Sequence, residues 1–379
     1  MLNFNEYLFL TNAESGAVMK KFSVGIIGAT GMVGQRFVSL LDGHPWFDVK
    51  ILAASKRSAG VSYRETMEGR WEMPLKMPGA VGNVIVLDAV ADAEKIASEV
   101  DFIFCAVKMP KKQTAELEER YAKLECPVIS NNGAYRLYND VPMIIPEINP
   151  EHSAVIDAQR RRLSTARGFI AVKSNCSVQC YVPALQPLMD LGITDVLACM
   201  YQAVSGAGRS LASWPEMVDN VIPYISEEEE KSEIEPLKIW GRVEGGVIVN
   251  ADRPCFTTQC VRVPVTDGHL GAVFARFEKK IPLDEIIERW KAFTGAPQKL
   301  GLPSAPKQFL HYFEEADRPQ TRLDRDLENG MAVSLGRLRA DTQYDVKFIS
   351  LSHNTIRGAA GGGILMAELL CEQGYIRHS

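Results

Sequence analysis

Apolar runs alternate with helix-like stretches over the first part of the chain. The runs lack polar residues at every second position, which is typical of strands buried on both faces of a sheet. Between them, apolar residues recur at the spacing of an amphipathic helix. Strands separated by helices in this way predict a parallel sheet with helices on both faces. We expect strands at residues 23–27, 49–53, 84–87, 102–107 and 128–130, and helices at residues 33–41 and 113–124.

The pattern changes after Cys176. Residues 195–204, 255–265 and 269–277 form longer strand-like segments in which apolar and polar residues alternate. Alternation of this kind predicts a mixed, largely antiparallel sheet in a second domain. Residues 354–374 carry a glycine-rich stretch directly before an apolar helix pattern. Because glycines let backbones approach closely, we expect this helix to pack back on the first domain.

Length and composition fit two domains. The chain has 379 residues, of which 46% are apolar, and this is more than one ordinary core requires. We expect an α/β protein in which residues 20–173 and 354–379 form a Rossmann-like domain and residues 174–353 form an α+β domain. Residues 1–18 are polar and unpatterned, and we interpret them as an extension or a misplaced start.

Charge and cysteine usage exclude several classes of protein. A formal net charge of -5 gives no sequence-wide basic field, so we expect no nucleic-acid partner. No apolar run approaches the roughly 20 residues that span a bilayer, and no secretory signal is recognisable, so we expect a cytoplasmic protein with no membrane partner. The eight cysteines show neither disulfide nor zinc-ligand spacing. They are expected to be reduced thiols, and we expect no metal.

A glycine-rich loop follows the first predicted strand and precedes the first predicted helix. Such glycines let the backbone turn and approach a pyrophosphate, whose charge lies at the helix N-terminus. The spacing is G-x-x-G-x-x-G rather than the dinucleotide G-x-G-x-x-G, so an ordinary tight turn is the alternative. The cofactor contacts that we expect here are Gly28, Thr30, Gly31, Met32 and Val33.

The end of the second predicted strand selects the cofactor. It carries Ser55, Arg57 and Ser58 and has no Asp or Glu to hold a ribose 2′-hydroxyl. An arginine and serine hydroxyls would instead bind a 2′-phosphate, which a carboxylate would repel. We therefore expect NADP; the alternative is a solvated basic loop.

Cys176 stands in a polar Ser-Asn-Cys-Ser setting at a predicted strand-to-helix junction. The N-terminus of a helix lowers the pKa of a thiol and raises its thiolate fraction. Pro183 and Pro187 predict that this helix kinks or ends early. Arg262 and His269 lie at opposite ends of a strand–turn element and could reach one ligand, although a surface histidine is the alternative. A thiolate, a histidine and a nicotinamide site together describe a dehydrogenase that works through an acyl thioester.

The chain resembles the aspartate-β-semialdehyde dehydrogenase family, in its archaeal and fungal branch, from about residue 22 to the C-terminus. The resemblance rests on seven segments in order, at residues 28–34, 174–177, 201–208, 228–231, 262–269, 336–339 and 357–361. It implies a fold like that of glyceraldehyde-3-phosphate dehydrogenase, in which residues 174–353 form the catalytic and dimerisation domain. It also implies a homodimer or homotetramer.

The resemblance implies a role for each matching residue. Cys176 would be the nucleophile, His269 the acid/base, and Gln202 a substrate contact beside the thiol. The substrate-binding residues would be Arg262 for the α-carboxylate and Glu228 for the ammonium, together with Asn175. The phosphate would be held by Arg136 and Lys231, and the cofactor would also contact Ser205, Gly206 and Asn354.

The implied reaction is the reversible, NADPH-dependent conversion of L-4-aspartyl phosphate to L-aspartate 4-semialdehyde and inorganic phosphate. It belongs to the biosynthesis of lysine, diaminopimelate, methionine and threonine. Malonyl-CoA reductase has the same fold, but its substrate has no amine for the Glu-Glu-x-Lys element at residues 228–231. N-acetyl-glutamyl-phosphate reductase acts on an acylated amine, which offers no charge to Glu228. A non-catalytic NADP-binding sensor would not need Cys176, His269 and Arg262 together.

Overall fold

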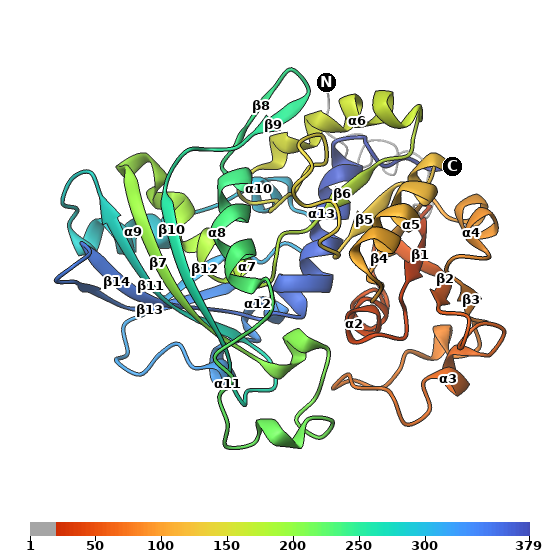
Figure 1. Ribbon diagram of the computed structural model, residues 1–379, viewed down its shortest axis with the longest axis horizontal. Coiled ribbons are helices and arrows are strands. Elements are labelled where there is room, and N and C mark those ends of the chain that lie inside the picture. Colours follow the sequence, from red (N-terminus) through yellow and green to blue (C-terminus); the bar gives the residue numbers. More distant parts are fainter. Residues whose placement is uncertain (1–19) are drawn as a thin grey trace, which may run out of the picture.

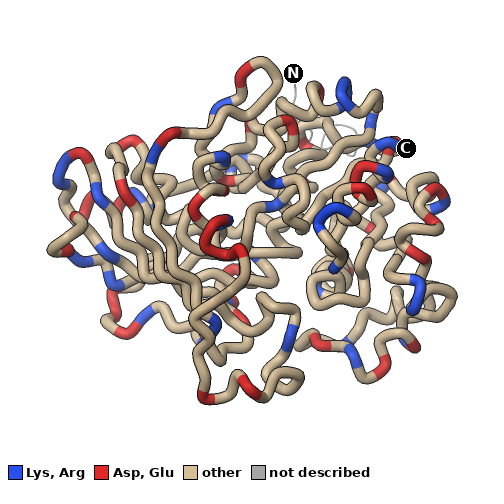
Figure 2. Tube along the Cα trace, in the orientation of Figure 1, with Lys and Arg blue, Asp and Glu red and all other residues tan. Residues whose placement is uncertain are grey.

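Two sheets lie side by side in the chain (Figure 1). The computed structural model describes residues 20–379, so residues 1–18, with their interpretation as an extension or a misplaced start, lie outside the described residues. Figure 2 shows Lys and Arg interspersed with Asp and Glu along the described chain. Among residues 20–379, no helix is both long and apolar enough to cross a membrane.

The first sheet has six strands in the order β3-β2-β1-β4-β5-β6, all paired in parallel. Its central strands are almost wholly buried, as their unbroken apolar runs predict. The strands are β1 (Phe22–Ile27), β2 (Phe47–Ala54), β3 (Leu87–Asp88), β4 (Phe102–Cys105), β5 (Val128–Ser130) and β6 (Ile170–Val172). The expected strand at residues 84–87 is mostly absent, because Ile85 pairs only through an isolated bridge to Ser62.

Helices cover this sheet and connect its strands (Figure 1). They are α2 (Met32–Leu40), α3 (Tyr63–Thr66), α4 (Ala93–Glu99), α5 (Lys111–Lys123) and α6 (Ile156–Leu163). The expected helices at residues 33–41 and 113–124 correspond to α2 and α5. The carboxyl ends of the strands therefore meet at one edge, which is where ligands bind in open parallel sheets.

The second sheet is mixed, in the order β10-β7-β11-β14-β13-β12. Its three central pairings are antiparallel, and its two outer pairings are parallel. The strands are β7 (Ile193–Gln202), β10 (Cys255–Arg262), β11 (His269–Phe277), β12 (Leu310–Phe313), β13 (Val333–Ala340) and β14 (Val346–Ser352), and a separate hairpin is formed by β8 (Arg242–Glu244) and β9 (Val247–Val249). The prediction of a mixed, largely antiparallel sheet is confirmed.

Helices from the second half of the chain pack between and around the sheets. They are α7 (Val178–Leu185), α8 (Glu228–Ile239), α9 (Leu283–Ala292), α10 (Ala296–Leu300), α11 (Thr321–Asp324) and α12 (Leu327–Gly330). Helix α7 contains Pro183 and passes into a 3₁₀ segment that contains Pro187, as expected from the two prolines. One apolar cluster includes Ile103, Val182 of α7 and Val273, so the two sheets share a continuous core.

The C-terminal segment returns to the first sheet. After β14 the chain forms a π-helical turn, η6 (Ile356–Ala360), which continues into α13 (Gly361–Glu372). Helix α13 contacts α2 and β5, and its Leu365 and Met366 share a buried cluster with Val24 and Phe104. The glycines in this stretch permit that close packing.

Candidate active site

The glycine-rich loop between β1 and α2 turns tightly against its own backbone. Gly28 has φ of 92°, a conformation that residues with a side chain rarely adopt. A Cβ on Gly34 would lie 2.7 Å from Ala29 Cα. No side chain caps the first turn of α2, so its backbone N–H groups are donors available to an anion.

A cavity of about 480 Å³ opens at the carboxyl edge of the first sheet. Of the expected cofactor residues, it is lined by Gly28, Thr30, Gly31, Ser55 and Arg57. Met32, Val33 and Ser58 are not among its lining residues: the first two begin α2, and Ser58 is buried in a turn closed on Ser55.

Three charged residues that the sequence did not single out line the same cavity. Lys56 precedes Arg57, and Lys108 follows the carboxyl end of β4. The common edge of parallel strands could have indicated Lys108. Asp88 ends β3, but one of its carboxylate oxygens already accepts the N–H groups of Val90 (2.8 Å) and Ala91 (2.9 Å). The two additional lysines make the cavity more suitable for phosphate groups.

Cys176 and His269 come together where the loop after β6 meets the start of β11. The Cys176 Sγ atom lies 3.4 Å from His269 Nε2. The Nδ1 atom of His269 faces the Ala203 N–H at 3.2 Å and can only accept that hydrogen. The neutral ring therefore carries its proton on Nε2, which faces the sulfur. Burial lowers the pKa of His269 well below its usual value, with the Arg262 charge as the next cause, so the ring stays neutral near pH 7.

The charge balance around Cys176 differs from the sequence expectation. Burial raises the pKa of its thiol, and the Glu228 carboxylate raises it further. The cations Lys173, Arg136 and Arg262 oppose this effect. Cys176 lies two residues before the first residue of α7, and burial, the largest cause, disfavours its thiolate form. The free protein therefore keeps Cys176 as a thiol at neutral pH.

Gln202 and Arg262 end two neighbouring parallel strands and are paired in register. Arg262 Nη1 donates to the Ala203 carbonyl at 2.7 Å and lies 3.5 Å from Gln202 Oε1. Gln202 Nε2 donates to Ser177 Oγ at 2.5 Å, in the loop of the nucleophile. A Cβ on Gly206 would lie 2.9 Å from Arg262 Nη1, so this glycine lets its loop pass directly over the arginine.

Asn175 connects the nucleophile loop to helix α8. Its Nδ2 donates to Glu228 Oε1 at 2.5 Å, and its Oδ1 accepts the Ser177 N–H at 2.7 Å. Glu228 is buried although it begins a run of charged residues, so its carboxylate faces the site and not the solvent. Lys231, one turn later on α8, is partly exposed, and its Nζ lies 3.4 Å from Glu227 Oε2.

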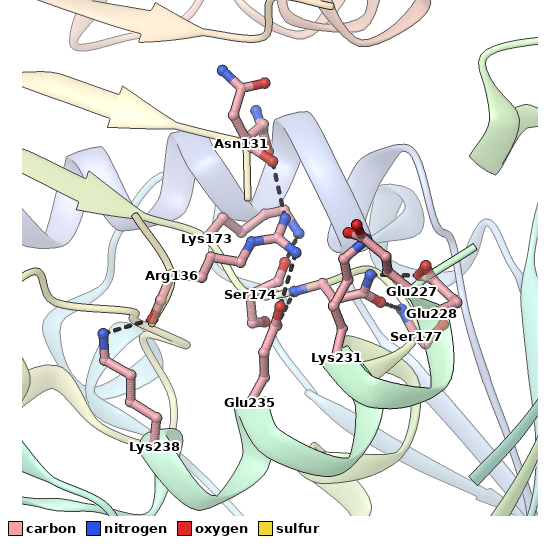
Figure 3. Close-up of polar contacts among 12 residues, drawn as sticks. Asn131, Arg136, Lys173, Ser174, Ser177, Glu227, Glu228, Lys231, Glu235 and Lys238 are labelled. Carbon is pink, nitrogen blue, oxygen red and sulfur yellow. Dashed lines mark hydrogen bonds and ion pairs between the residues drawn. The ribbon is translucent and has the colours of Figure 1, made fainter. Parts of the chain in front are cut away.

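Of the two expected phosphate residues, Lys231 lies on α8 and Arg136 on the segment that faces this helix (Figure 3). Arg136 Nη1 donates to Glu235 Oε1 at 3.0 Å, and Nη2 donates to the Asn131 carbonyl at 3.0 Å. A cavity of about 270 Å³ is lined by Arg136, Lys231, Glu235 and Lys111, among others. Burial lowers the pKa of the nearby Lys173 to about 7. The sequence did not indicate Lys173, Glu235 or Lys111 as site residues.

Asn354 and Ser205 lie together beside the histidine loop. Asn354 Oδ1 accepts the Gly268 N–H at 2.8 Å, and its Nδ2 donates to Ser205 Oγ at 2.8 Å. Gly206 follows Ser205, and a Cβ there would lie 3.1 Å from His269 Cε1. Asn354, Ser205 and Gly206 therefore lie around His269 and its loop, and they do not line the cavity at the glycine-rich loop.

Element η6 packs directly behind the nucleophile. A Cβ on Gly358 would lie 2.9 Å from Cys176 Cβ, so only glycine fits there. The neighbouring Arg357 is fully buried and forms a bidentate ion pair with Glu147 at 2.7 and 2.6 Å. Its Nε also donates to Gln179 Oε1 at 3.0 Å. The C-terminal segment thus fixes the rear of the cysteine loop.

Two family models match the chain. The NAD-binding domain of semialdehyde dehydrogenases matches residues 23–156, and the dimerisation domain of semialdehyde dehydrogenases matches residues 185–357.

Curated relatives match over almost their whole length. An aspartate-semialdehyde dehydrogenase of Archaeoglobus fulgidus is 41% identical over 94% of this chain and 100% of its own length. One of Schizosaccharomyces pombe is 41% identical over 93% of this chain and 99% of its own length. Both an archaeal and a fungal relative are therefore similar to this chain.

Solved structures agree with these matches. The aspartate semialdehyde dehydrogenase of Candida albicans with NADP superposes with a TM-score of 0.84 at 36% identity, covering 93% of this chain and 99% of that one. Aspartate semialdehyde dehydrogenase II of Vibrio cholerae, complexed with ASA, superposes with a TM-score of 0.70 at 26% identity. It also covers 93% of this chain and 99% of that one.

Proposed function

Since the chain belongs to the aspartate-semialdehyde dehydrogenase family, we propose that it converts L-4-aspartyl phosphate and NADPH to L-aspartate 4-semialdehyde, inorganic phosphate and NADP. This is a step in the biosynthesis of lysine, diaminopimelate, methionine and threonine. The observation that carries the proposal is the position of the Cys176 thiol, 3.4 Å from His269 Nε2, with Arg262 and Glu228 beside it. The site combines a nucleophile, a proton donor and groups for an amino acid.

The first half of the reaction forms a thioester. Cys176 is a thiol in the free protein, so its proton first passes to the phosphate group of the bound substrate or to water. The thiolate then attacks the acyl carbon, the bond from carbon to the phosphate oxygen breaks, and phosphate leaves with the electron pair. Arg136 and Lys231 would hold the phosphate through charge-assisted hydrogen bonds. Arg262 would grip the α-carboxylate and Glu228 the ammonium, which fixes the acyl group over the sulfur.

The second half of the reaction reduces that thioester. Bound NADPH supplies the hydride, and the residues around the cavity at the sheet edge fit a 2′-phosphorylated dinucleotide. The Nε2–H of His269 faces the sulfur and would stabilise the oxyanion and the departing thiolate by donating a hydrogen bond. Collapse of the tetrahedral oxyanion breaks the carbon–sulfur bond and gives the aldehyde, and the Nε2 proton of His269 would pass to the departing sulfur, which returns as the thiol. His269 thus serves as the acid in this direction and regains its proton from solvent.

A substrate panel tests the function. Wild-type protein is assayed with aspartate semialdehyde and phosphate, with malonate semialdehyde and CoA, and with N-acetyl-glutamate semialdehyde and phosphate, each with NADP. We expect phosphate-dependent NADP reduction with aspartate semialdehyde. A clear preference for malonate semialdehyde with CoA would assign the chain to the malonyl-CoA reductases instead, and absence of turnover on all three would favour a sensor.

Arg57 is expected to select NADP over NAD. It lines the cavity beside Ser55, where no acidic residue ends β2. Arg57→Ala should weaken NADP binding by about 1.5–3 kcal/mol, the range for a charged hydrogen bond, and leave NAD binding almost unchanged. Titration of both cofactors by fluorescence measures this difference. An equal loss for both cofactors would mean that Arg57 supports the fold and does not read the 2′-phosphate.

The reactivity of Cys176 should follow the charge of Glu228. Because the thiol pKa is raised and His269 is neutral, alkylation of Cys176 by iodoacetamide should increase continuously as the pH rises from 6 to 9. An ion pair of thiolate and imidazolium would give a plateau at low pH instead. Glu228→Gln removes the anion that opposes thiolate formation, so its alkylation at pH 7.5 should be several-fold faster. Unchanged alkylation in this variant would remove Glu228 from the control of the thiol.

An open face of the second sheet supports self-association. On this face Leu197 opposes Phe274, and Tyr201 opposes Leu270, with the pair of Cys199 and Ala272 between them. The alternate residues of both strands, such as Met200 and Val273, are buried on the other face. Tyr201 is 38% exposed. The chain carries the dimerisation domain of the family, and we place a homodimer interface on this face, with a homotetramer as the alternative.

All eight cysteines are free, which supports a cytoplasmic location.

A further inference from the structure

Helix α8 presents a row of charged residues to the site, and only the first two have a role so far. Glu228, Lys231, Glu235 and Lys238 recur every three or four residues, so they share one face of the helix (Figure 3). Glu228 and Lys231 face the expected substrate and phosphate. Glu235 and Lys238 are each 1% exposed, deeper in the protein. A buried carboxylate needs specific partners, and those of Glu235 are informative.

Glu235 bridges the two parts of the site that must act on one acyl phosphate. Its Oε1 accepts a hydrogen bond from Arg136 Nη1 at 3.0 Å. Its Oε2 accepts one from the backbone N–H of Asn175 at 2.5 Å, directly before Cys176. One carboxylate therefore sets the spacing between the guanidinium for the phosphate and the main chain of the nucleophile.

Lys238 fixes the other end of this arrangement. Its Nζ donates to the carbonyl oxygens of Arg136 (2.7 Å), Tyr138 (2.6 Å) and Val141 (2.8 Å). The loop that carries Arg136 is thus fastened to α8 through its backbone, while Glu235 orients the side chain. The guanidinium of Arg136 is therefore positioned by two contacts, through its side chain to Glu235 and through its backbone carbonyl to Lys238.

The local charge balance favours a phosphate dianion. Lys173 is 2% exposed, and its Nζ donates to the Ser174 carbonyl; within residues 20–379 it forms no ion pair. Glu235 is the carboxylate bound to Arg136, and it compensates one of these two cations. Lys173, whose pKa burial lowers to about 7, is only partly protonated near neutral pH, and a bound phosphate dianion would favour its charged form.

We propose that Glu235 is a positioning residue for the phosphate half of the reaction, and this rests on the proposed function. It holds Arg136 and the Cys176 loop at a fixed separation, so that one acyl phosphate can place its phosphate on the guanidinium and its carbonyl on the sulfur. Glu235 acts through these two groups and does not touch the substrate.

Glu235→Gln tests the proposal, because both partners of Glu235 are donors and each uses a different oxygen. Glutamine offers only one acceptor oxygen, and its NH₂ group would face the other donor. In the oxidative direction, with aspartate semialdehyde and NADP, we expect the KM for inorganic phosphate to rise about tenfold or more and kcat to fall. The Kd for NADP should stay within twofold.

Glu229→Gln is a matched control on the same helix. Glu229 also accepts from one side chain and one backbone N–H, but these are Gln259 (2.5 Å) and Cys260 (3.0 Å) of strand β10. Both of these donors use the same Glu229 oxygen, so Glu229→Gln can keep both hydrogen bonds and controls for the loss of a carboxylate charge from this helix. A phosphate KM in Glu235→Gln that equals that of Glu229→Gln, or that stays within twofold of wild type, would overturn the inference.

Two further measurements keep the outcomes distinct. Should Glu235→Gln fail to fold, Glu235→Asp replaces it: the charge remains, but the shorter side chain cannot reach both donors, so a raised phosphate KM is again expected. An unchanged KM in folded Glu235→Asp would contradict the positioning role. Loss of the proposed function would instead appear in wild-type protein, as absence of phosphate-dependent turnover of aspartate semialdehyde.

Discussion

Cys176→Ala is expected to abolish turnover, by roughly 10⁴-fold or more, because the thioester cannot form without the sulfur. NADP binding should be nearly unchanged, since the cavity at the edge of the first sheet does not include Cys176. Steady-state rates in both directions, together with fluorescence titration of NADP, measure the two effects.

Cys255→Ala is the control for this prediction. Cys255 is an exposed free thiol at the start of β10, so its loss should leave the rate near that of wild type. Buried thiols such as Cys180 are less suitable, because Cys180 contacts the carbonyl of His269. Substantial residual activity in Cys176→Ala would show that hydride transfer does not pass through a thioester, and the mechanism would have to be abandoned.

Arg262→Lys should reduce kcat/KM for aspartate semialdehyde roughly 10- to 150-fold, which corresponds to a loss of about 1.5–3 kcal/mol in transition-state binding. Lysine keeps the charge but loses the planar fork that grips a carboxylate at two points. It also has no Nη1 to donate to the Ala203 carbonyl while a second nitrogen faces the substrate. Steady-state kinetics of Arg262→Lys and wild-type protein measure the loss. Arg276→Lys, on the exposed part of β11, is the control.

A substrate analogue separates recognition from folding. An amino aldehyde without the α-carboxylate should be a poor substrate for wild-type protein, and Arg262→Lys should make it little worse, because the interaction is already missing. If the variant loses the same factor on both substrates, Arg262 supports the site structurally and a different group binds the carboxylate.

Much of the architecture could be predicted from the sequence because its signals are local. Residues 128–130 and 269–277 were expected as strands, and they form β5 and β11 with the same bounds. The run at residues 84–87 contributes only Leu87 to a strand, because this part of the chain lies at the outer edge of the sheet. Hydrophobic periodicity does not indicate which strand has a partner on both sides.

The candidate site residues that the sequence indicates are those whose residue type alone suggests the chemistry. Arg262 ends β10 and His269 begins β11, on either side of β7, and the loop after β6 places Cys176 Sγ 3.4 Å from His269 Nε2. Glu235 could not be found in this way, because a glutamate in a charged helix has the pattern of a solvated face. The raised thiol pKa was also out of reach, since it depends on burial and on Glu228, which lies 52 positions further along the chain.

The return of α13 to the first sheet has a consequence for how the protein is made. The side chains that cluster with Val24 and Phe104 include Leu365 and Met366, which follow the whole second sheet in the sequence. During synthesis all six strands of the N-terminal sheet precede the second sheet, but α13 follows it, so the apolar surface that α13 covers stays exposed until the second sheet has been made. A stop codon before residue 356 would therefore leave the first sheet without this cover, and we expect such a chain to aggregate more readily when it is synthesised without chaperones.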